Sequence, residues 1–279
     1  GKVLTKNKVT LRANVSSQYI SALLLIAPKL ENGLELTLEG EITSVPYIKM
    51  TLDLLNQIGV ETVFDDDFIK VKPLNKELKA HSLIVESDWS SASYYYSIVA
   101  LSEIGTEIIL SAYKESSLQG DSALVNIYKQ FGVETTFLNN TITLKKKSKN
   151  ANAIKLDLNN SPDIAQTIAV TCLGLGIKCH LTGLQTLKIK ETDRLLALKN
   201  EIEKLGGKIS VTNDSLSLEE SIFLKSDCEI ATYNDHRMAM SFAPLALKTS
   251  LQIADPMVVS KSYPTFWDDL KSIGFKISK

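Results

Sequence analysis

The chain has 279 residues, of which 44% are hydrophobic and 23% charged, which excludes a disordered protein and allows a sizeable core. Because 31 basic residues balance 32 acidic ones, the net charge of −1 does not indicate a partner among nucleic acids. The apolar runs are too short to cross a bilayer, no signal peptide is visible and only three cysteines occur, so we expect a cytoplasmic protein without a membrane partner.

Two patterns recur along the chain with the same period and predict an internal repeat. The first pattern is a segment of helical character that ends in a glycine, at positions 59, 132, 206 and 274. The second is an apolar segment that begins with Ser, Pro-Asp or His, at positions 16, 90, 162 and 236. Because both series keep in step, we predict four units of about 73 residues each.

Each unit predicts the same order of elements. An apolar helix comes first, and a strand follows it at 34–38, 106–110, 177–181 and 250–254. A second, amphipathic helix ends at the glycine, which enters the left-handed conformation without strain. A hairpin of alternating strands closes the first three units, at 60–72, 133–145 and 208–219. The sequence therefore predicts an α/β (α+β) protein built of helix-strand-helix-hairpin repeats.

The polar segment 73–82 predicts a linker after the first unit. We therefore expect a partial domain of one unit over 1–86 and a domain of three units over 87–279. The basic run at 145–149 is expected to be the solvated end of a hairpin.

Two positions in each unit are unusually polar. The start of the first helix carries Ser16, Ser17, Gln18, Ser90, Ser91, Asp163, His236 and Arg237. The loop before the second helix carries Ser44, Tyr47, Gln119, Asp121, Lys190, Glu191, Arg194 and Lys261. Because helix N-termini favour anions, these positions predict a site where several N-termini converge on an anionic ligand.

Simple capping is the alternative at the helix starts. Capping explains Ser90 or Ser91 better than a ligand does, and it explains Asp163 about equally well. Cations at a helix N-terminus oppose the dipole, so His236 and Arg237 favour a bound anion, unless Arg237 only pairs with a carboxylate.

The segment KETDR, at 190–194, places a lysine, a carboxylate and an arginine within five residues. This set suits an acid/base pair beside an anion-binding cation. On local grounds alone, a solvated helix start with a Glu191–Arg194 pair explains it slightly better. The scattered histidines, the lack of a Cys-x-x-Cys pair and the lack of a phosphate-binding glycine motif indicate neither a metal nor a nucleotide cofactor.

Longer motifs occur along the chain in a recognisable order. They are NVSSQYISALLLIAP, SVPYIKMTL, SSASYYYSIVA, LQGD, PDIAQTIAV, KETDRL, ATYNDHRMAM and DPMVVSKSYPTF. Through these segments, residues 12–275 resemble the 5-enolpyruvylshikimate-3-phosphate synthase family. The resemblance implies six units in two three-unit domains, with an active site in the cleft between them. It also implies that this chain corresponds to the last two-thirds of a full-length, monomeric enzyme.

The resemblance implies transfer of the enolpyruvyl group of phosphoenolpyruvate to the 5-hydroxyl of shikimate-3-phosphate. Phosphate is released through a tetrahedral intermediate, without a metal or another cofactor, in the shikimate pathway of aromatic amino acid biosynthesis. Ser16, Ser17 and Ser44 are then expected to hold the 3-phosphate. Gln18 is expected to lie between the two substrates, and Tyr47 to pack against the shikimate ring.

The same resemblance assigns the chemistry to the later units. Asp163 is the first candidate for general base, Lys190 binds substrate and shuttles a proton, and Glu191 is the second acid/base. The expected phosphoenolpyruvate clamp is formed by Arg194, Arg237 and Lys261. Thr186 stands where the family often has Asn, which puts that substrate contact in question. N-terminal Lys, Ser and Arg groups of the family have no counterpart here, so we expect this chain alone to be a poor or inactive catalyst.

Two other functions fit part of the pattern. One is the related enzyme that transfers enolpyruvate to UDP-N-acetylglucosamine, and the Ser-Ser-Gln and Asn-Asp-His-Arg segments favour the shikimate enzyme over it. The other is a non-catalytic repeat protein that binds phosphorylated ligands. Asp163, Lys190 and Glu191 together argue against a simple binder, because anion binding needs no carboxylates.

Overall fold

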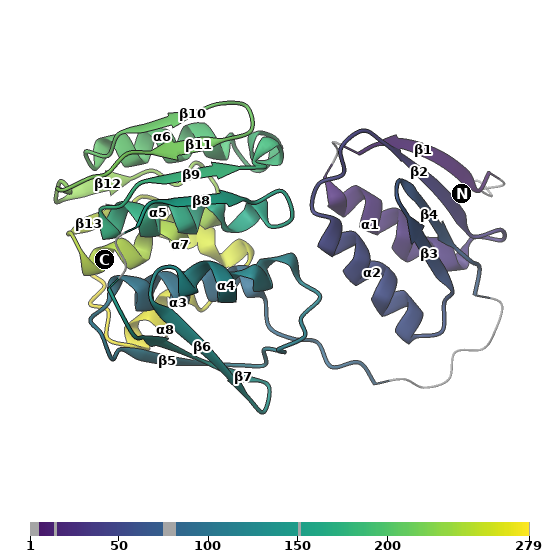
Figure 1. The fold of residues 1–279 in the computed structure, drawn as a ribbon, viewed down its shortest axis with the longest axis horizontal. Coiled ribbons are helices and arrows are strands. Elements are labelled where there is room, and N and C mark those ends of the chain that lie inside the picture. Colours follow the sequence, from purple (N-terminus) through teal and green to yellow (C-terminus); the bar gives the residue numbers. More distant parts are fainter. Residues whose placement is uncertain (1–5, 14–15, 75–81, 150–151, 279) are drawn as a thin grey trace. The chain divides into compact units, whose positions relative to one another are not determined.

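The computed structural model describes residues 6–13, 16–74, 82–149 and 152–278, which form two compact units (Figure 1). Unit 1 contains the residues up to Glu86 together with Ser116–Ser122, and unit 2 contains Ser87–Glu115 and the residues from Ala123 onward. The segment Ser116–Ser122 thus groups with unit 1, although the sequence places it in the second domain. Most of the predicted linker, residues 75–81, lies outside the described residues.

Unit 1 is a four-stranded sheet with two helices on one face (Figure 1). Its elements are β1 (Lys8–Arg12), α1 (Ser17–Ile26), η1 (Ala27–Lys29), β2 (Leu34–Glu39), α2 (Val45–Gln57), β3 (Thr62–Asp65) and β4 (Phe68–Val71). The strand order is β1-β2-β4-β3, with β1 parallel to β2 and the other pairs antiparallel. Ile20 and Leu24 of α1 and Leu36 and Ile69 of the sheet are fully buried in the core between them.

Unit 2 contains three sheets around a group of central helices (Figure 1). The elements of the first part are α3 (Trp89–Leu101), β5 (Glu107–Ser111), α4 (Leu124–Lys129), β6 (Val133–Leu138) and β7 (Thr141–Lys146), and η2 (Gly120–Ala123) lies where the chain returns from unit 1 to unit 2. The next are β8 (Ile154–Asp157), η3 (Pro162–Ile164), α5 (Ala165–Leu175), β9 (Cys179–Thr182), η4 (Gln185–Ile189), α6 (Arg194–Lys204), β10 (Ile209–Val211) and β11 (Leu216–Leu218). The last are β12 (Cys228–Ile230), α7 (His236–Phe242), η5 (Ala243–Leu247), β13 (Leu251–Ile253), η6 (Pro256–Lys261) and α8 (Phe266–Ser272). The strand orders are β5-β7-β6, β10-β11-β9-β8 and β12-β13.

The first helices of the three repeats meet at the centre of unit 2. Ser93 Oγ of α3 lies 3.1 Å from Thr167 Oγ1 of α5, which lies 3.2 Å from Ser241 Oγ of α7. All three side chains are buried, and successive members are 74 residues apart. One turn further along, Thr171 Oγ1 donates to Ser97 Oγ at 2.8 Å, again across 74 residues. Equivalent positions of the repeat therefore contact one another, and hydroxyl groups satisfy each other in an otherwise apolar core.

The sequence did not predict the short strand that precedes the first helix in three of the repeats. β1, β8 and β12 precede the first helix of their repeats and pair in parallel with β2, β9 and β13. They have only three to five residues, too few for a clear alternation of polar and apolar side chains. In these three repeats the order therefore begins strand, helix, strand, helix, and the parallel pair places two helix starts at one sheet edge.

The glycine ends of the second helices are confirmed. Gly59, Gly132, Gly206 and Gly274 have φ values of 90°, 77°, 93° and 106°. The predicted solvation of the basic run is wrong for Lys146, which is only 3% exposed. Lys146 Nζ donates to the carbonyls of Ala100 and Phe131, both at 2.7 Å, and so satisfies the ends of two helices.

Candidate functional site

Parallel strand pairs bring the predicted site residues of unit 2 to common edges. β8 and β9 are parallel, so the residues that follow them start at the same edge of the sheet. Asp163 lies in η3 after β8, and the KETDR segment follows η4 after β9. In the same way, His236 and Arg237 follow β12, and Lys261 ends η6 after β13.

Arg194 is the centre of the resulting cluster, and it is only 1% exposed. Its Nε donates to Asp235 Oδ2 at 2.7 Å, its Nη1 to Asp163 Oδ1 at 2.8 Å and its Nη2 to Glu191 Oε2 at 2.6 Å. The predicted Glu191–Arg194 pair is therefore confirmed, but it is one part of a larger network. Because each guanidinium nitrogen meets a carboxylate, Arg194 fixes the positions of three acidic side chains.

Asp163 is surrounded by three cations, two from the KETDR segment and one from α7. Lys190 Nζ lies 3.3 Å and Arg237 Nη2 3.8 Å from its carboxylate, in addition to Arg194. Burial opposes ionisation of Asp163, but the charges of Arg237, Lys190 and Arg194 outweigh it and hold its pKa well below the usual range. The side chain is still 23% exposed, so a ligand can reach it. Asp163 therefore pairs with side-chain cations, and the N-cap position of η3 belongs to Ser161.

Asp235 is the residue of this cluster that the sequence reading did not select. It is fully buried, caps the N-terminus of α7 through the Arg237 amide at 2.8 Å and binds Arg194. The signal that marks Asp235 in the sequence is its place in the Asn-Asp-His-Arg segment, directly before the cationic pair His236 and Arg237. His236 Nδ1 lies 3.8 Å from Asp235 Oδ1, and burial together with the charge of Arg237 lowers the pKa of His236.

The start of α3 resolves one of the capping alternatives. The N-cap is Asp88, which accepts from the amides of Ser90 at 2.9 Å and Ser91 at 3.3 Å. The prediction that Ser90 or Ser91 is the cap is therefore wrong, because an aspartate two residues earlier fills that position. Ser90 Oγ instead accepts from Arg237 Nη2 at 3.3 Å, which joins α3 to the cluster.

Lys261 reaches the cluster through a loop. Its Nζ donates to the carbonyl of Asn234 at 2.5 Å, next to Asp235. Tyr233 and Asn234 both have left-handed backbone conformations, with φ of 53° and 57°. The loop therefore holds a strained shape between β12 and α7.

The site residues predicted in unit 1 lie at two neighbouring helix starts. β1 and β2 are parallel, so α1 and α2 begin at the same edge of the sheet. Ser16 caps α1 by accepting from the Gln18 amide at 3.3 Å, and Ser17 is the first helical residue. Ser44 precedes α2 with φ 54° and makes no capping bond through its side chain, and Tyr47 lies in the first turn of α2.

Two buried polar side chains lie close in sequence to the reactive groups of unit 2. Among the described residues, Thr186 Oγ1 and both amide atoms of Gln166 are buried without a hydrogen-bond partner. Gln166 follows Asp163 by one helical turn, and Thr186 precedes Lys190 by four residues. Both groups therefore retain unused hydrogen-bonding capacity.

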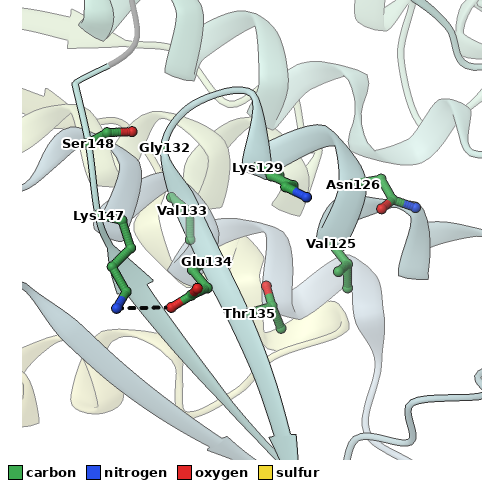
Figure 2. A pocket seen from close by; sticks show the side chains of 9 residues that line it. All are labelled: Val125, Asn126, Lys129, Gly132, Val133, Glu134, Thr135, Lys147 and Ser148. Atoms are coloured by element: carbon green, nitrogen blue, oxygen red, sulfur yellow. Dashed lines mark ion pairs between the residues drawn. The ribbon is translucent and has the colours of Figure 1, made fainter.

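A pocket of about 510 Å³ lies elsewhere in unit 2, between α4, β6 and the end of β7 (Figure 2). Figure 2 shows Lys147 pointing toward Glu134, and the two form an ion pair of 3.1 Å. None of the cluster residues lines this pocket. Across the described ranges, no group of three His, Cys, Asp or Glu side chains could hold a metal ion, and no helix is long and apolar enough to span a membrane.

The family of the chain follows from comparisons with known proteins. The family model described as EPSP synthase (3-phosphoshikimate 1-carboxyvinyltransferase) matches residues 1–270. The 3-phosphoshikimate 1-carboxyvinyltransferase of Bacteroides fragilis is 47% identical over 99% of this chain, and that of Colwellia psychrerythraea 35% identical over 98%. A solved EPSP synthase from Acinetobacter baumannii has the same fold, with a TM-score of 0.77 at 21% identity over 98% of this chain.

The chain spans 68% and 63% of the two curated relatives and 64% of the solved structure. The match covers nearly all of this chain and both described units. Together with the family model over residues 1–270, it shows that the chain belongs to the EPSP synthase (3-phosphoshikimate 1-carboxyvinyltransferase) family of transferases.

Proposed function

We propose that this chain provides a large part of the active site of an enolpyruvyl transferase. The enzyme transfers the enolpyruvyl group of phosphoenolpyruvate to the 5-hydroxyl of shikimate-3-phosphate and releases phosphate, in the cytoplasm. The observation that carries the proposal is the cluster in which Lys190, Arg194 and Arg237 surround the carboxylate of Asp163. Family membership supports the choice of reaction.

The charges of the cluster suit a donor with a carboxylate and a phosphate. Arg237 and Lys190 are 15% and 20% exposed at their side chains, so both are accessible to a ligand. Arg194 is buried behind them and holds the carboxylates in place. We assign the anionic groups of phosphoenolpyruvate to Arg237 and Lys261, while Arg194, the third predicted cation of the clamp, acts through its charge and through the carboxylates that it binds.

Asp163 has the position of a general base but the low pKa of a weak one. Its carboxylate is ionised at neutral pH because three cations stabilise it. When the anionic groups of phosphoenolpyruvate bind these cations, their hold on Asp163 weakens and its pKa rises. Substrate binding thus strengthens the base at the moment when the accepting hydroxyl has to lose its proton.

The two steps of the reaction need two proton movements on the donor. In the addition, the hydroxyl oxygen bonds to C2 of phosphoenolpyruvate while the methylene carbon gains a proton. In the elimination, that methyl group loses a proton and phosphate leaves C2. We assign the proton transfers to Glu191 and Lys190, whose side chains are 38% and 20% exposed and flank Arg194 and Asp163.

We assign the binding of the acceptor, shikimate-3-phosphate, to unit 1. Ser16, Ser17 and Ser44 lie at neighbouring helix starts, where free amides and hydroxyl groups suit the 3-phosphate. Gln18 and Tyr47 then contact the substrates, as the family resemblance implies. Shikimate-3-phosphate is favoured over UDP-N-acetylglucosamine because the curated relatives that match are 3-phosphoshikimate 1-carboxyvinyltransferases.

Phosphorus NMR on the chain at high concentration tests this function. Phosphoenolpyruvate is mixed with shikimate-3-phosphate in one sample and with UDP-N-acetylglucosamine in another. We expect a new phosphate line, growing slowly, only in the first sample. Product formation only in the second sample would show that UDP-N-acetylglucosamine, and not shikimate-3-phosphate, is the acceptor. A Glu191→Ala variant distinguishes the enzyme from a binder, since a binder keeps its anion affinity and an enzyme loses turnover.

A further inference from the structure

Glu201 is a buried carboxylate of α6 that the proposed mechanism does not use. Its side chain is fully inaccessible, and it lies seven residues, or two helical turns, after Arg194 on the same face of the helix. It accepts from the amide of Ala231 at 3.1 Å and from the hydroxyl of Tyr233 at 2.7 Å. The Nζ of Lys204, whose side chain is 45% exposed, is its third partner at 2.7 Å.

The loop that Glu201 holds leads into α7, which carries Arg237, and accepts a hydrogen bond from Lys261. It runs from Ala231 to Asp235 and contains the two left-handed residues, Tyr233 and Asn234. A tyrosine in this conformation is unfavourable and persists only where its surroundings fix it. The hydrogen bond from Tyr233 to Glu201 stabilises this conformation. Burial together with this bond raises the pKa of the Tyr233 hydroxyl.

Residues of α6 therefore form hydrogen bonds with the loop near both of its ends. Arg194 binds Asp235 at one end, and Glu201 binds Ala231 and Tyr233 at the other. The carbonyl between these points, that of Asn234, accepts from Lys261, and Asp235 caps the helix that begins with His236 and Arg237.

We propose that Glu201 is a positioning residue, which sets the places of Arg237 and Lys261 for phosphoenolpyruvate by fixing the loop from Ala231 to Asp235. This inference rests on the proposed function for the identity of the ligand. It assigns Glu201 no contact with either substrate. Loss of Glu201 is then expected to affect the donor much more than the acceptor, most of whose proposed ligands lie in unit 1.

A comparison of Glu201→Gln with Glu203→Gln on the full chain tests the inference. Glu203 is the matched control, an exposed glutamate of the same helix that pairs with Lys199. Calorimetric titrations give the dissociation constants of phosphoenolpyruvate and shikimate-3-phosphate, and amide hydrogen exchange follows the Arg237 N–H that Asp235 caps. Tyr233→Phe serves as a milder variant that removes one of the bonds to Glu201.

We expect Glu201→Gln to weaken phosphoenolpyruvate binding about tenfold and to speed exchange at Arg237 by a similar factor. The affinity for shikimate-3-phosphate should stay within about twofold, and the Glu203 variant should match the wild type. Unchanged donor affinity, or an equal loss for both substrates, would overturn the inference. If the wild type binds neither substrate, the proposed function fails, and the exchange rate at Arg237 alone decides: faster exchange in Glu201→Gln supports positioning, and an unchanged rate refutes it.

Discussion

Arg194 Nε donates a 2.7 Å hydrogen bond to Asp235 Oδ2, and both side chains are buried although 41 residues separate them. The bond ties the start of α6 to the start of α7, and with them two of the segments that carry the site. A buried charge that loses its partner is costly, so this pair is expected to matter for stability as well as for function.

Replacing Asp235 by Ala is expected to lower the free energy of unfolding by about 3 kcal/mol, because a buried arginine loses a partner and α7 loses its cap. Urea denaturation measures the change. Glu203→Ala, which breaks an exposed ion pair with Lys199, is the control and should cost less than about 1 kcal/mol. A cost for Asp235→Ala as small as that of the control would contradict the central position of this pair.

The depressed pKa of Asp163 predicts a pH dependence of stability. A carboxyl group with a lowered folded-state pKa stabilises the fold above its unfolded pKa of about 3.9, and this contribution disappears as the pH falls toward the folded value. The wild type should therefore lose more unfolding free energy between about pH 5 and pH 3 than Asp163→Asn does. Denaturant titrations across this range give the two curves, which should converge toward acid, and parallel curves would refute the assignment.

Because hydroxyl groups contact one another at the centre of unit 2, we expect an isosteric substitution that removes one of them to lower the free energy of unfolding. Thr167→Val keeps the shape but leaves Ser93 and Ser241 short of a partner, so we expect a loss of about 1–3 kcal/mol in unfolding free energy. Thr136→Val, on the exposed side of β6, is the control and should change stability by less than about 0.5 kcal/mol. If thermal or urea denaturation gave equal values for both variants, the hydroxyl contacts would contribute nothing to the packing of the repeats.

Substitutions of Ser44 in unit 1 are expected to change ligand affinity and stability independently. Its φ of 54° is unfavourable for any residue with a side chain, and its hydroxyl makes no capping bond. Ser44→Gly should therefore be at least as stable as Ser44→Ala, while both weaken shikimate-3-phosphate binding about tenfold through loss of one hydroxyl contact to phosphate. Calorimetry on the two variants tests this, and full affinity in either would remove Ser44 from the acceptor site.

The sequence predicted much of the fold because the repeat supplied each signal several times. Glycines such as Gly59 and Gly206 mark helix ends wherever they recur, and their positive φ values follow from the same geometry. The short strands β1, β8 and β12 escaped prediction because each has too few residues to show a period, and their pairing depends on a partner distant in sequence.

The site was predictable by residue type but not by arrangement. KETDR and the Asp-His-Arg segment drew attention because cations and carboxylates stand together. The burial of Arg194 among carboxylates was not predictable, because it depends on contacts with Asp163 and Asp235 across 31 and 41 residues. The burial of Lys146 escaped the sequence for the same reason, since the carbonyls that it binds come from two other helices.

The central claim is that the cluster around Asp163 and Arg237 binds phosphoenolpyruvate. Phosphorus NMR during titration of phosphoenolpyruvate into the chain tests it most directly, with Arg237→Ala as the variant and Lys188→Ala, at an exposed lysine that contacts Asn213, as the control. A saturable shift or broadening of the phosphoenolpyruvate line in the wild type and the control, lost in Arg237→Ala, is the predicted result. No change of that line with a folded wild type, or the same change with Arg237→Ala, would contradict the account.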